Sequence, residues 1–499
     1  MASFLSALLV VLQPGNLLAL FVCAVIGVIL GAIPGLAGGM GITLILPLTF
    51  AMTTELSFSM LLGMYVGGVS GAFIASVLVG IPGSASAIAT CYDGYPMTKK
   101  GKAAKALSIG ITGSFIGTFF SVLVAVFASK ALADVAMTLG PWEYFSLCFM
   151  AVSLVIGLGG KSVFKSLIGA FMGLFLATIG TDQVTNQMRF TFRNYNLIGG
   201  ISVIALLMGT FALQQVAMGY GQGNQEMPKV DGSKLGGFGL TLKDFKDNFK
   251  TIILGFGIGL GIGFLPGLGG GVANMIAYSQ AKKSSKNPEE WGQGHEGGVW
   301  ISEVSNNASI GGAIIPMLSL GIPGDGTTVM LLSALTIHGL QAGPLFIGSH
   351  PDLANMIFAA LLLAAILVFV VELLTKRWFP KLLNAPYHYL YGSIVMICFM
   401  GAFASGNSMF NVYEAIIFCV FGILMMVLDI PMSPLMLSYI LGQKLEYYFR
   451  LGTSYAEGSY ASFFTRPISG IFLVIGIYSL FSPLIKSAIK KAKAKKTAA

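Results

Sequence analysis

Charged residues are scarce in this sequence. Asp, Glu, Lys and Arg make up 10% of its 499 residues, whereas they make up about a quarter of a typical soluble protein. Hydrophobic residues make up 55%, and the mean hydropathy is +0.82. So few charges cannot cover a surface that faces water, so lipid must be the main solvent of this chain. The composition excludes a soluble multidomain protein, and its hydrophobicity excludes a disordered chain.

Patterns that mark metal, nucleotide and nucleic-acid sites are also missing. The five cysteines lie in apolar stretches without metal-ligand spacing, which indicates small hydrophobic side chains. The four histidines form no metal constellation, and no Gly-rich phosphate-binding motif with its lysine occurs. The net charge of +9 comes from short segments beside apolar runs and from the C-terminal tail, which is typical of cytoplasmic loops. We therefore expect no enzyme, no cofactor and no nucleic-acid partner.

Long uncharged runs dominate what remains. Examples are residues 1–54, 56–92 and 251–281. About 20 apolar residues cross a bilayer as a helix, so the longest runs hold several crossings or a broken one. Short segments of alternating polarity, which mark membrane β-strands, are absent. The sequence thus predicts an all-α polytopic membrane protein with roughly 10–12 transmembrane segments.

The two halves of the chain share two motifs in the same order. Gly31-Ala-Ile-Pro-Gly-Leu-Ala-Gly-Gly39 corresponds to Gly263-Phe-Leu-Pro-Gly-Leu-Gly-Gly-Gly271, and Gly80-Ile-Pro-Gly-Ser84 corresponds to Gly321-Ile-Pro-Gly-Asp325. Matched motifs in matched order indicate an internal duplication. The predicted organisation is a first transmembrane repeat at 1–220, a cytoplasmic linker at 221–250, a second repeat at 251–485 and a basic tail at 486–499.

Charge indicates how the two repeats are oriented. The segment 93–105, after the first Ile-Pro-Gly, contains four lysines and should be cytoplasmic. The corresponding segment 338–350 has no Lys or Arg and should lie outside. The repeats would then enter the membrane from opposite sides, which is the inverted-repeat pattern of secondary transporters.

The Pro-Gly motifs carry the predicted site. Proline and glycine interrupt helices, and within a membrane such breaks persist only around a cavity or inside protein. Each break exposes a helix N-terminus, which attracts anions. The predicted substrate-binding residues are Gly35, Gly83, Ser84, Ser86, Gly267, Ser305, Asn306, Asn307, Gly324 and Thr327. The cation-coupling candidates are Glu303, Asp325 and Thr328.

Structural roles compete with these assignments. Glycines often serve close helix packing, and most single Ser or Thr side chains bond to their own helix. The adjacent Asn306 and Asn307 favour binding because their flanks are apolar. Glu303 fits a functional role and a place near the cytoplasmic boundary equally well, although acids inside a membrane are functional candidates by default. Asp93 is more typical of a loop than of a site.

Several segments together resemble the TctA family, the large membrane subunit of bacterial tripartite tricarboxylate transporters. They are Ile33-Pro-Gly-Leu36, Ile81-Pro-Gly-Ser84, Asp93-Gly-Tyr-Pro-Met97, Glu303-Val-Ser-Asn-Asn307, Gly311-Gly-Ala-Ile-Ile-Pro316, Gly321-Ile-Pro-Gly324 and Gly343-Pro-Leu345. The resemblance implies a permease in the bacterial cytoplasmic (inner) membrane, a small TctB-like membrane subunit and a periplasmic TctC-like solute-binding protein that delivers carboxylates. It also implies symport with Na⁺ or H⁺. Ser309-Ile310 stands where the family usually has small alanines.

These lines of reasoning favour a carboxylate carrier that works by cation-coupled alternating access, with citrate as the nominal substrate. Its substrate would lie between the half-helix N-termini, near Asn306 and Asn307. A passive channel is one alternative. An intramembrane aspartyl protease is another, because Asp93 and Asp325 are two acids within apolar runs, but the required Gly-x-Gly-Asp motif is broken by Ile322.

Overall fold

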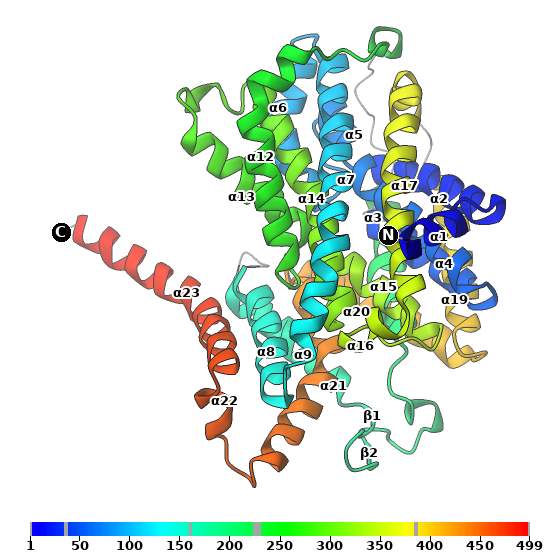
Figure 1. The fold of residues 1–499 in the computed structure, drawn as a ribbon, viewed down its shortest axis with the longest axis vertical. Coiled ribbons are helices and arrows are strands. Elements are labelled where there is room, and N and C mark those ends of the chain that lie inside the picture. Colours follow the sequence, from blue (N-terminus) through cyan, green and yellow to red (C-terminus); the bar gives the residue numbers. More distant parts are fainter. Residues whose placement is uncertain (1, 34–37, 159–161, 223–230, 384–387, 498–499) are drawn as a thin grey trace.

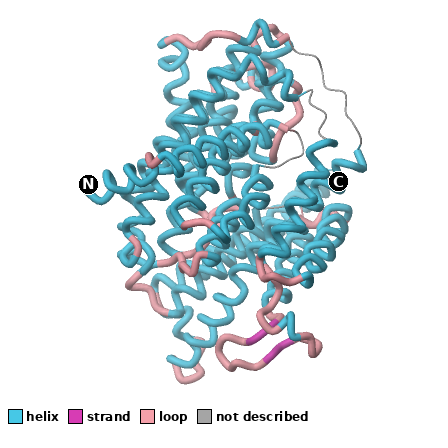
Figure 2. The backbone as a smooth tube through the Cα atoms, turned by 90° about the vertical axis from the view of Figure 1, so that its right-hand side faces the viewer, coloured by secondary structure: helices cyan, strands magenta, loops and turns pink. Residues whose placement is uncertain are grey.

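Helices account for nearly all of the described secondary structure. The computed structural model describes residues 2–33, 38–158, 162–222, 231–383 and 388–497. Within these ranges the strands are β1 (Gly180–Thr181) and β2 (Met188–Arg189), which pair antiparallel in one small hairpin (Figures 1 and 2). The prediction of an all-α chain is confirmed.

The first half of the chain contains helices α1 to α11. Their bounds are α1 (Ala2–Val11), α2 (Pro14–Ala32), α3 (Gly38–Ile45), η1 (Leu46–Ala51), α4 (Thr54–Gly71), α5 (Phe73–Leu78), η2 (Ala85–Ala87), α6 (Ile88–Lys99), α7 (Ala103–Ala136), α8 (Pro141–Leu158), α9 (Val163–Ala177), η3 (Tyr195–Leu197), α10 (Val203–Leu207), the π-helical turn η4 (Met208–Leu213) and α11 (Gln214–Gln222).

The second half contains helices α12 to α23. Their bounds are η5 (Gly232–Leu235), α12 (Leu242–Phe264), α13 (Gly269–Ser284), η6 (Pro288–Glu290), α14 (Glu296–Leu320), α15 (Gly326–Ile337), α16 (Pro344–Ser349), α17 (Pro351–Thr375), η7 (Lys376–Trp378), α18 (Phe379–Leu383), α19 (His388–Ala404), α20 (Met409–Val427), α21 (Met432–Tyr455), α22 (Ala461–Thr465) and α23 (Pro467–Thr497). Helix α12 begins within the segment predicted as a linker, because the Asp244 carboxylate accepts the Thr241 N–H and caps its first turn. Helix α23 continues into the basic tail.

Six of the described helical segments are long and apolar enough to cross a membrane. They are Pro14–Ala32, Thr54–Leu78, Ala103–Ala136, Val203–Gly221, Pro351–Leu383 and Met409–Val427. Shorter apolar helices accompany them, at Gly39–Ala51, Pro141–Gly157, Val163–Ala177, Gly326–Ile337, Tyr391–Ala404 and Pro467–Ser482. The chain is therefore a polytopic membrane protein, as the sequence predicts.

Helices end or begin beside the Pro-Gly motifs, and glycine backbone geometry explains two of these helix ends. Helix α14 ends at Gly321, whose φ of +67° is left-handed and turns the chain out of the helix. Between α12 and α13, Gly267 has a φ of +77°, and a Cβ there would lie 1.9 Å from the Cγ2 of Val155. Neither position accommodates another residue without strain.

Other glycines let helices pack closely within each half. Gly63, Gly67 and Gly71 on α4 face α2, and Gly259 and Gly263 on α12 face α14. A Cβ on any of them would lie 2.2–2.4 Å from a backbone oxygen of the facing helix. This spacing of small residues four apart is common at membrane helix interfaces. Much of the high glycine content thus serves packing, which is the structural role that the sequence left open.

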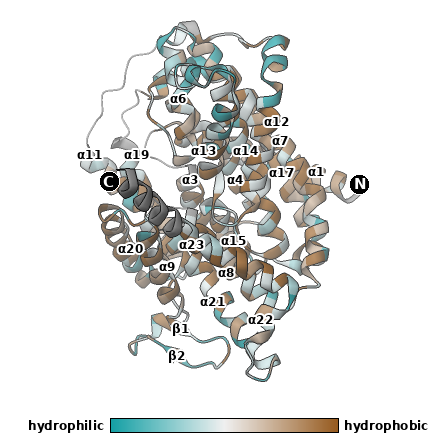
Figure 3. Cartoon of the chain, turned by 90° about the vertical axis from the view of Figure 1, so that its left-hand side faces the viewer, coloured by the Kyte–Doolittle hydropathy of each residue, from teal (hydrophilic) through white to brown (hydrophobic). Residues whose placement is uncertain are grey.

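The two ends of the molecule are formed by different helix ends and loops. We call one end the lysine face; it comprises the end of α6 and the starts of α7, α12 and α14. There Lys105 pairs with Asp244 at 2.8 Å and with Glu296 at 2.6 Å. The opposite end, the hairpin face, comprises β1, β2 and the end of α21. Figure 1 places α6 towards the lysine face and α15 and α16 in the other half of the molecule. Figure 3 shows hydrophilic residues at both ends and hydrophobic residues between them.

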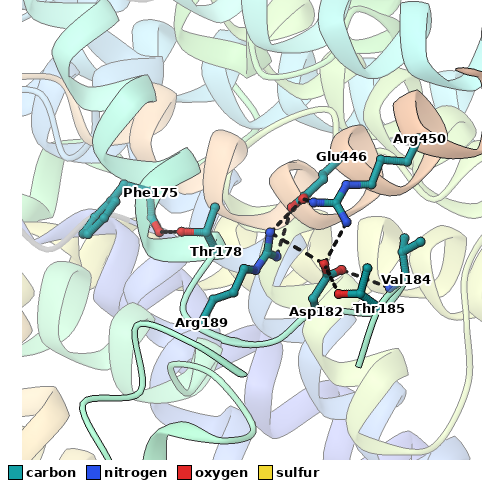
Figure 4. A network of polar contacts seen from close by, with 8 residues as sticks. All are labelled: Phe175, Thr178, Asp182, Val184, Thr185, Arg189, Glu446 and Arg450. Carbon is teal, nitrogen blue, oxygen red and sulfur yellow. Dashed lines mark hydrogen bonds and ion pairs between the residues drawn. The ribbon is translucent and has the colours of Figure 1, made fainter. Parts of the chain in front are cut away.

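The hairpin is fixed to α21 by a network of four charged side chains (Figure 4). Arg189 donates to both carboxylate oxygens of Glu446, at 2.7 and 3.0 Å. Arg450 pairs with Asp182 at 2.7 Å and with Glu446 at 2.6 Å. Asp182 also accepts the N–H of Val184 at 3.0 Å. Two carboxylates therefore balance two guanidinium groups at this corner.

Candidate functional site

A cavity of about 370 Å³ lies where the broken helices meet. All four breaks contribute residues to its wall. They are Gly39 near the start of α3, Ser84, Ala85, Ser86 and Ile88 ahead of and at the start of α6, Gly267 to Gly271 around the start of α13, and Asp325, Gly326 and Thr327 at the start of α15. The wall is completed by Tyr65, Gly68, Val69, Val272, Met275, Asn306, Ser309, Ile310 and Ser433. Four segments that are far apart in the sequence thus converge on one space.

The cavity is lined by helix N-termini and not by basic side chains. Helices α13 and α15 begin at its wall, at Gly269 and Gly326, and α6 begins there after the short turn η2. The first N–H groups of a helix lack partners within it and carry the positive end of the helix dipole. Among the described lining residues there is no Lys, Arg or His, and Asp325 is the single charged side chain. An anion here would be held by backbone groups.

Asn306 is the lining residue with unused hydrogen-bonding capacity. Its side chain is fully buried, and neither Oδ1 nor Nδ2 has a hydrogen bond of standard geometry among the described residues, although the amide lies near the Glu303 carboxyl on the same helix. A Cβ on Gly270 would lie 2.2 Å from its Oδ1, so the missing side chain of Gly270 lets the amide reach the first turn of α13. A buried amide without a partner costs about 1–3 kcal/mol, a penalty that a polar ligand would remove.

Asp325 caps α15 and lines the same cavity. Its Oδ1 accepts the N–H of Thr328 at 2.7 Å, and its Oδ2 accepts the hydroxyl of Tyr65 at 3.2 Å. Thr328 is buried and does not line the cavity; its hydroxyl donates back to Asp325. Of the two neighbouring threonines, Thr327 therefore faces the cavity and Thr328 shapes the helix start.

Some of the predicted residues around the first Ile-Pro-Gly motif line the cavity, and others serve packing. Ser84 and Ser86 line the cavity, with their hydroxyl oxygens 2.8 Å apart. Gly83 is a packing residue, because a Cβ there would lie 2.3 Å from the carbonyl oxygen of Gly31. Gly35 lies outside the described residues.

In the second half of the chain, too, only some of the predicted residues line the cavity. Gly324 packs against α14, where a Cβ would lie 2.5 Å from that of Ala313. The hydroxyl of Ser305 donates to the carbonyl of Ser302 on the same helix, at 3.2 Å. Neither residue lines the cavity, whereas Gly267 does.

Glu303 and Asn307 form a second polar cluster behind the cavity. The fully buried Glu303 carboxyl accepts hydrogen bonds from the hydroxyl of Thr90 and, at 3.2 Å, from the hydroxyl of Ser114. The amide of Asn307 donates to Ser114 and to the Glu303 carbonyl, both at 3.0 Å. The two adjacent asparagines thus point in different directions, Asn306 to the cavity and Asn307 to α7.

The prediction that Asp93 is a loop residue is wrong. It is fully buried within α6, where Tyr278 donates its hydroxyl to the carboxylate at 2.8 Å. Three backbone N–H groups, those of Gly292, Gly294 and His295, donate to its other oxygen at 2.7–2.8 Å. These four hydrogen bonds satisfy the carboxylate of Asp93 and attach α6 to the segment before α14. The lysines that follow Asp93 in the sequence had suggested a loop. Asp93 is not among the residues that line the cavity of Asp325.

The sequence reasoning missed one residue of the cavity wall and one residue that holds two of its helices together. Tyr65 lies in α4 without a surrounding motif, and no sequence signal marks it. Asn274 follows the glycine-rich break and holds the start of α6 against α13, since its Nδ2 donates to the Ser86 carbonyl at 2.8 Å and its Oδ1 accepts the Ala89 N–H at 3.1 Å. An amide shortly after a glycine-rich break in an uncharged run was a signal that could have identified it.

Comparison with known families decides the classification. Residues 17–437 match the model of the family described as the tripartite tricarboxylate transporter TctA family. The chain belongs to this family. The match spans all four Pro-Gly breaks and every residue of the cavity wall, so this TctA chain carries its cavity within the family's shared region.

Two relatives are proteins of Agrobacterium vitis, and both are described as uncharacterised. One, a 52.8 kDa protein in the TAR-I ttuC' 3' region, is 32% identical over 480 residues, which cover 96% of this chain and 95% of the relative. The other, in the TAR-II ttuC' 3' region, is 32% identical over 230 residues, which cover 46% of this chain and 95% of the relative. No solved structure matches this TctA protein.

Proposed function

We propose that this TctA protein is the permease subunit of a secondary transporter that imports organic carboxylates across the bacterial cytoplasmic membrane. A TctC-like periplasmic solute-binding protein would deliver the substrate, and a small TctB-like membrane subunit would complete the complex. The observation that carries the proposal is the convergence of helix N-termini from all four breaks on one cavity. Such sites, formed by broken helices of inverted repeats, bind anionic groups in secondary transporters.

The lining chemistry supports a carboxylate as the ligand. The N–H groups at the starts of α13 and α15, the Ser84 and Ser86 hydroxyls and the unpaired Asn306 amide can all donate to carboxylate oxygens. Asp325 opposes an anion by its charge, so a bound cation or a proton would have to accompany the substrate. Coupling to an H⁺ or Na⁺ gradient follows from this need.

The arrangement of helices supports alternating access. Asn274 and Asp93 attach α6 to α13 and to the segment before α14. On the other side of the cavity, α15 is bonded to α4 through Tyr65 and Asp325. Movement of the first group of helices against the second would open the cavity to one face and then to the other.

The test is transport in proteoliposomes that contain the full chain with its small subunit and solute-binding protein. Radiolabelled citrate and related di- and tricarboxylates are offered with an inward cation gradient. We expect accumulation above equilibrium of at least one of them. Unlabelled substrate inside should accelerate labelled uptake by counterflow, because a carrier returns loaded faster than empty. Uptake without counterflow would identify a passive channel and contradict the proposal.

A further inference from the structure

Two buried acids of the TctA chain lie between its cavity and the lysine face. Glu303 on α14 and Glu372 on α17 are each 0% exposed. Neither forms an ion pair within the described residues. An unpaired charge buried in a membrane is costly, so such acids are kept for a function or are held neutral by a proton.

The two acids have partners of the same chemical kind. Thr90 and Ser114 donate hydroxyl groups to Glu303. Ser70 on α4 donates its hydroxyl to the Oε2 of Glu372 at 3.0 Å, while Oε1 has no hydrogen-bond partner among the described residues. Hydroxyl groups can both donate and accept, so they suit a carboxyl that gains and loses a proton.

The position of Glu303 on α14 connects the cavity to the lysine face. Asn306, in the cavity wall, is three residues away, or about 4.5 Å along the helix axis. Glu296, whose carboxylate pairs with Lys105 at the lysine face, is seven residues away in the other direction, or about 10 Å. Just after α17, at the start of η7, Lys376 follows Glu372 by four residues, and its ammonium donates to Ser108 at 2.9 Å.

No nearby cation neutralises either acid. The other titratable groups on the elements packed against them are Cys91, Tyr92, Asp93, Tyr95 and Lys99 on α6, Lys105, Lys130 and Asp134 on α7, Lys243, Asp244, Lys246, Asp247 and Lys250 on α12, Tyr278, Lys282 and Lys283 on α13, Glu55 and Tyr65 on α4, Cys23 on α2, His350 beside α16, and Lys376 and Arg377 after α17. Lys105 is paired at the lysine face and Lys376 is bonded to Ser108. At Glu372 a metal cation would need several oxygen ligands, whereas the described hydrogen-bond partners of this carboxyl amount to one hydroxyl; a proton needs only the carboxylate oxygen.

We infer that the coupled cation is a proton and that Glu303 and Glu372 carry it between the cavity and the lysine face. This inference rests on the proposed function, because it assigns the coupling ion of the same carrier. The proton binds a carboxylate oxygen while the cavity faces the hairpin side and leaves towards the lysine face. One O–H bond forms and the same bond later breaks, so no oxidant or reductant is needed.

The first test compares Glu303→Gln and Glu372→Gln with Glu414→Gln in proteoliposomes of the complete complex. Glu414 is a matched control, because it is a buried acid on α20 that accepts the Ser202 N–H outside this region. An inward gradient of about one pH unit should drive about tenfold accumulation per proton. We expect the two glutamine variants to lose this accumulation while keeping counterflow, and Glu414→Gln to keep both. Each variant is first checked for a single peak in size-exclusion chromatography.

The second test needs no substrate. Infrared difference spectra of the purified full chain, recorded between acidic and alkaline pH, should contain the C=O stretching band of a protonated carboxyl group. We expect Glu303→Gln and Glu372→Gln each to remove part of this band and Glu414→Gln to leave that part unchanged. If either variant does not fold, the other and the wild-type spectrum still decide the question.

The outcomes separate this inference from the proposed function. Counterflow in the wild type together with accumulation driven only by Na⁺ at constant pH would overturn the proton assignment and leave the carrier in place. Unchanged accumulation in both variants, or an unchanged carboxyl band, would also overturn it. Absence of counterflow in the wild type would instead contradict the proposed function.

Discussion

Polar side chains have partners of opposite charge in the hairpin network, whereas the cavity wall contains a buried polar side chain without a partner. At the hairpin, Asp182 and Glu446 are matched by Arg189 and Arg450 at 2.6–3.0 Å, so each charge has a partner of opposite sign, although the Nε of Arg189 has no hydrogen-bond partner among the described residues. In the cavity, the Asn306 amide has no partner among the described residues, and no cation lines the wall there. Native structures rarely leave buried polar groups unpaired. The paired charges of the hairpin therefore indicate a structural role, whereas a buried amide without a partner in the wall of a cavity indicates a place for a polar ligand.

The largest effect is expected from filling the space beside the unpaired amide. A Cβ on Gly270 would meet Asn306 Oδ1 at 2.2 Å and Ser309 Oγ at 3.1 Å, so Gly270→Ala must displace the amide or the start of α13. We expect carboxylate uptake to be abolished while the protein still inserts and elutes as a single species. Gly261→Ala on α12 is the control, because a Cβ there has no neighbour within 4 Å. Normal uptake by Gly270→Ala would place the substrate elsewhere.

Removing the amide itself should have a smaller effect. Asn306→Ala deletes one hydrogen-bonding group that would face a charged ligand, which corresponds to about 1.5–3 kcal/mol. We expect the apparent affinity for carboxylate to fall by about 10- to 100-fold. Ser305→Ala is the neighbouring control, since the Ser305 hydroxyl bonds within its own helix. Equal affinities for the two variants, measured by concentration-dependent uptake, would contradict the assignment of Asn306.

The contrast also marks how far the sequence could predict the site. The Pro-Gly breaks were predictable because proline and glycine act locally on the backbone, and Ser84, Ser86, Gly267, Asp325 and Thr327 do line the cavity. The directions of neighbouring helical side chains were not predictable. Successive residues on a helix are turned by about 100°, and only the packing of α14 shows which of two adjacent asparagines faces the cavity.

The packing partners of Glu303 and Glu372 could not be predicted from the sequence either. The burial of Glu303 depends on α6 and α7, and that of Glu372 on α4, all from the first half of the chain. A carboxyl at the edge of an uncharged run, as Glu372 is, has the same local sequence signature as a residue at the membrane boundary. The all-α class, in contrast, follows from composition and run length alone, because these set the solvent of the chain.

At the hairpin, the expected effect is on stability and not on transport chemistry. The N–H of Val184, the Thr185 hydroxyl and the Arg450 guanidinium hold the pKa of Asp182 well below its usual range. Asp182→Asn should therefore lower the thermal unfolding temperature at neutral pH, with a loss of about 1–3 kcal/mol. An unchanged unfolding temperature would show that the network contributes little.

The stabilisation by Asp182 should depend on pH, and the direction of its pKa shift sets the direction of that dependence. Because the pKa of Asp182 is lower in the folded state, its contribution is full above the ordinary Asp value of about 4 and is lost as the pH falls towards the folded value. The difference in unfolding temperature between wild type and Asp182→Asn should thus shrink below pH of about 4. A difference that stays constant on acidification would contradict the pairing.

The smallest effect on transport is expected from single cysteine substitutions that test how the two repeats are oriented in the membrane. Lys102 lies just before α7 at the lysine face, and Gln341 lies between α15 and α16 in the opposite half. Single cysteines at these positions, in a background without the five native cysteines, should leave uptake nearly unchanged. A membrane-impermeant thiol reagent should label Gln341→Cys from outside intact cells and Lys102→Cys only after permeabilisation. Labelling of both from the same side would refute the inverted repeat. The half-helix N-termini would then not approach the cavity from opposite sides, and the unpaired Asn306 would need another explanation.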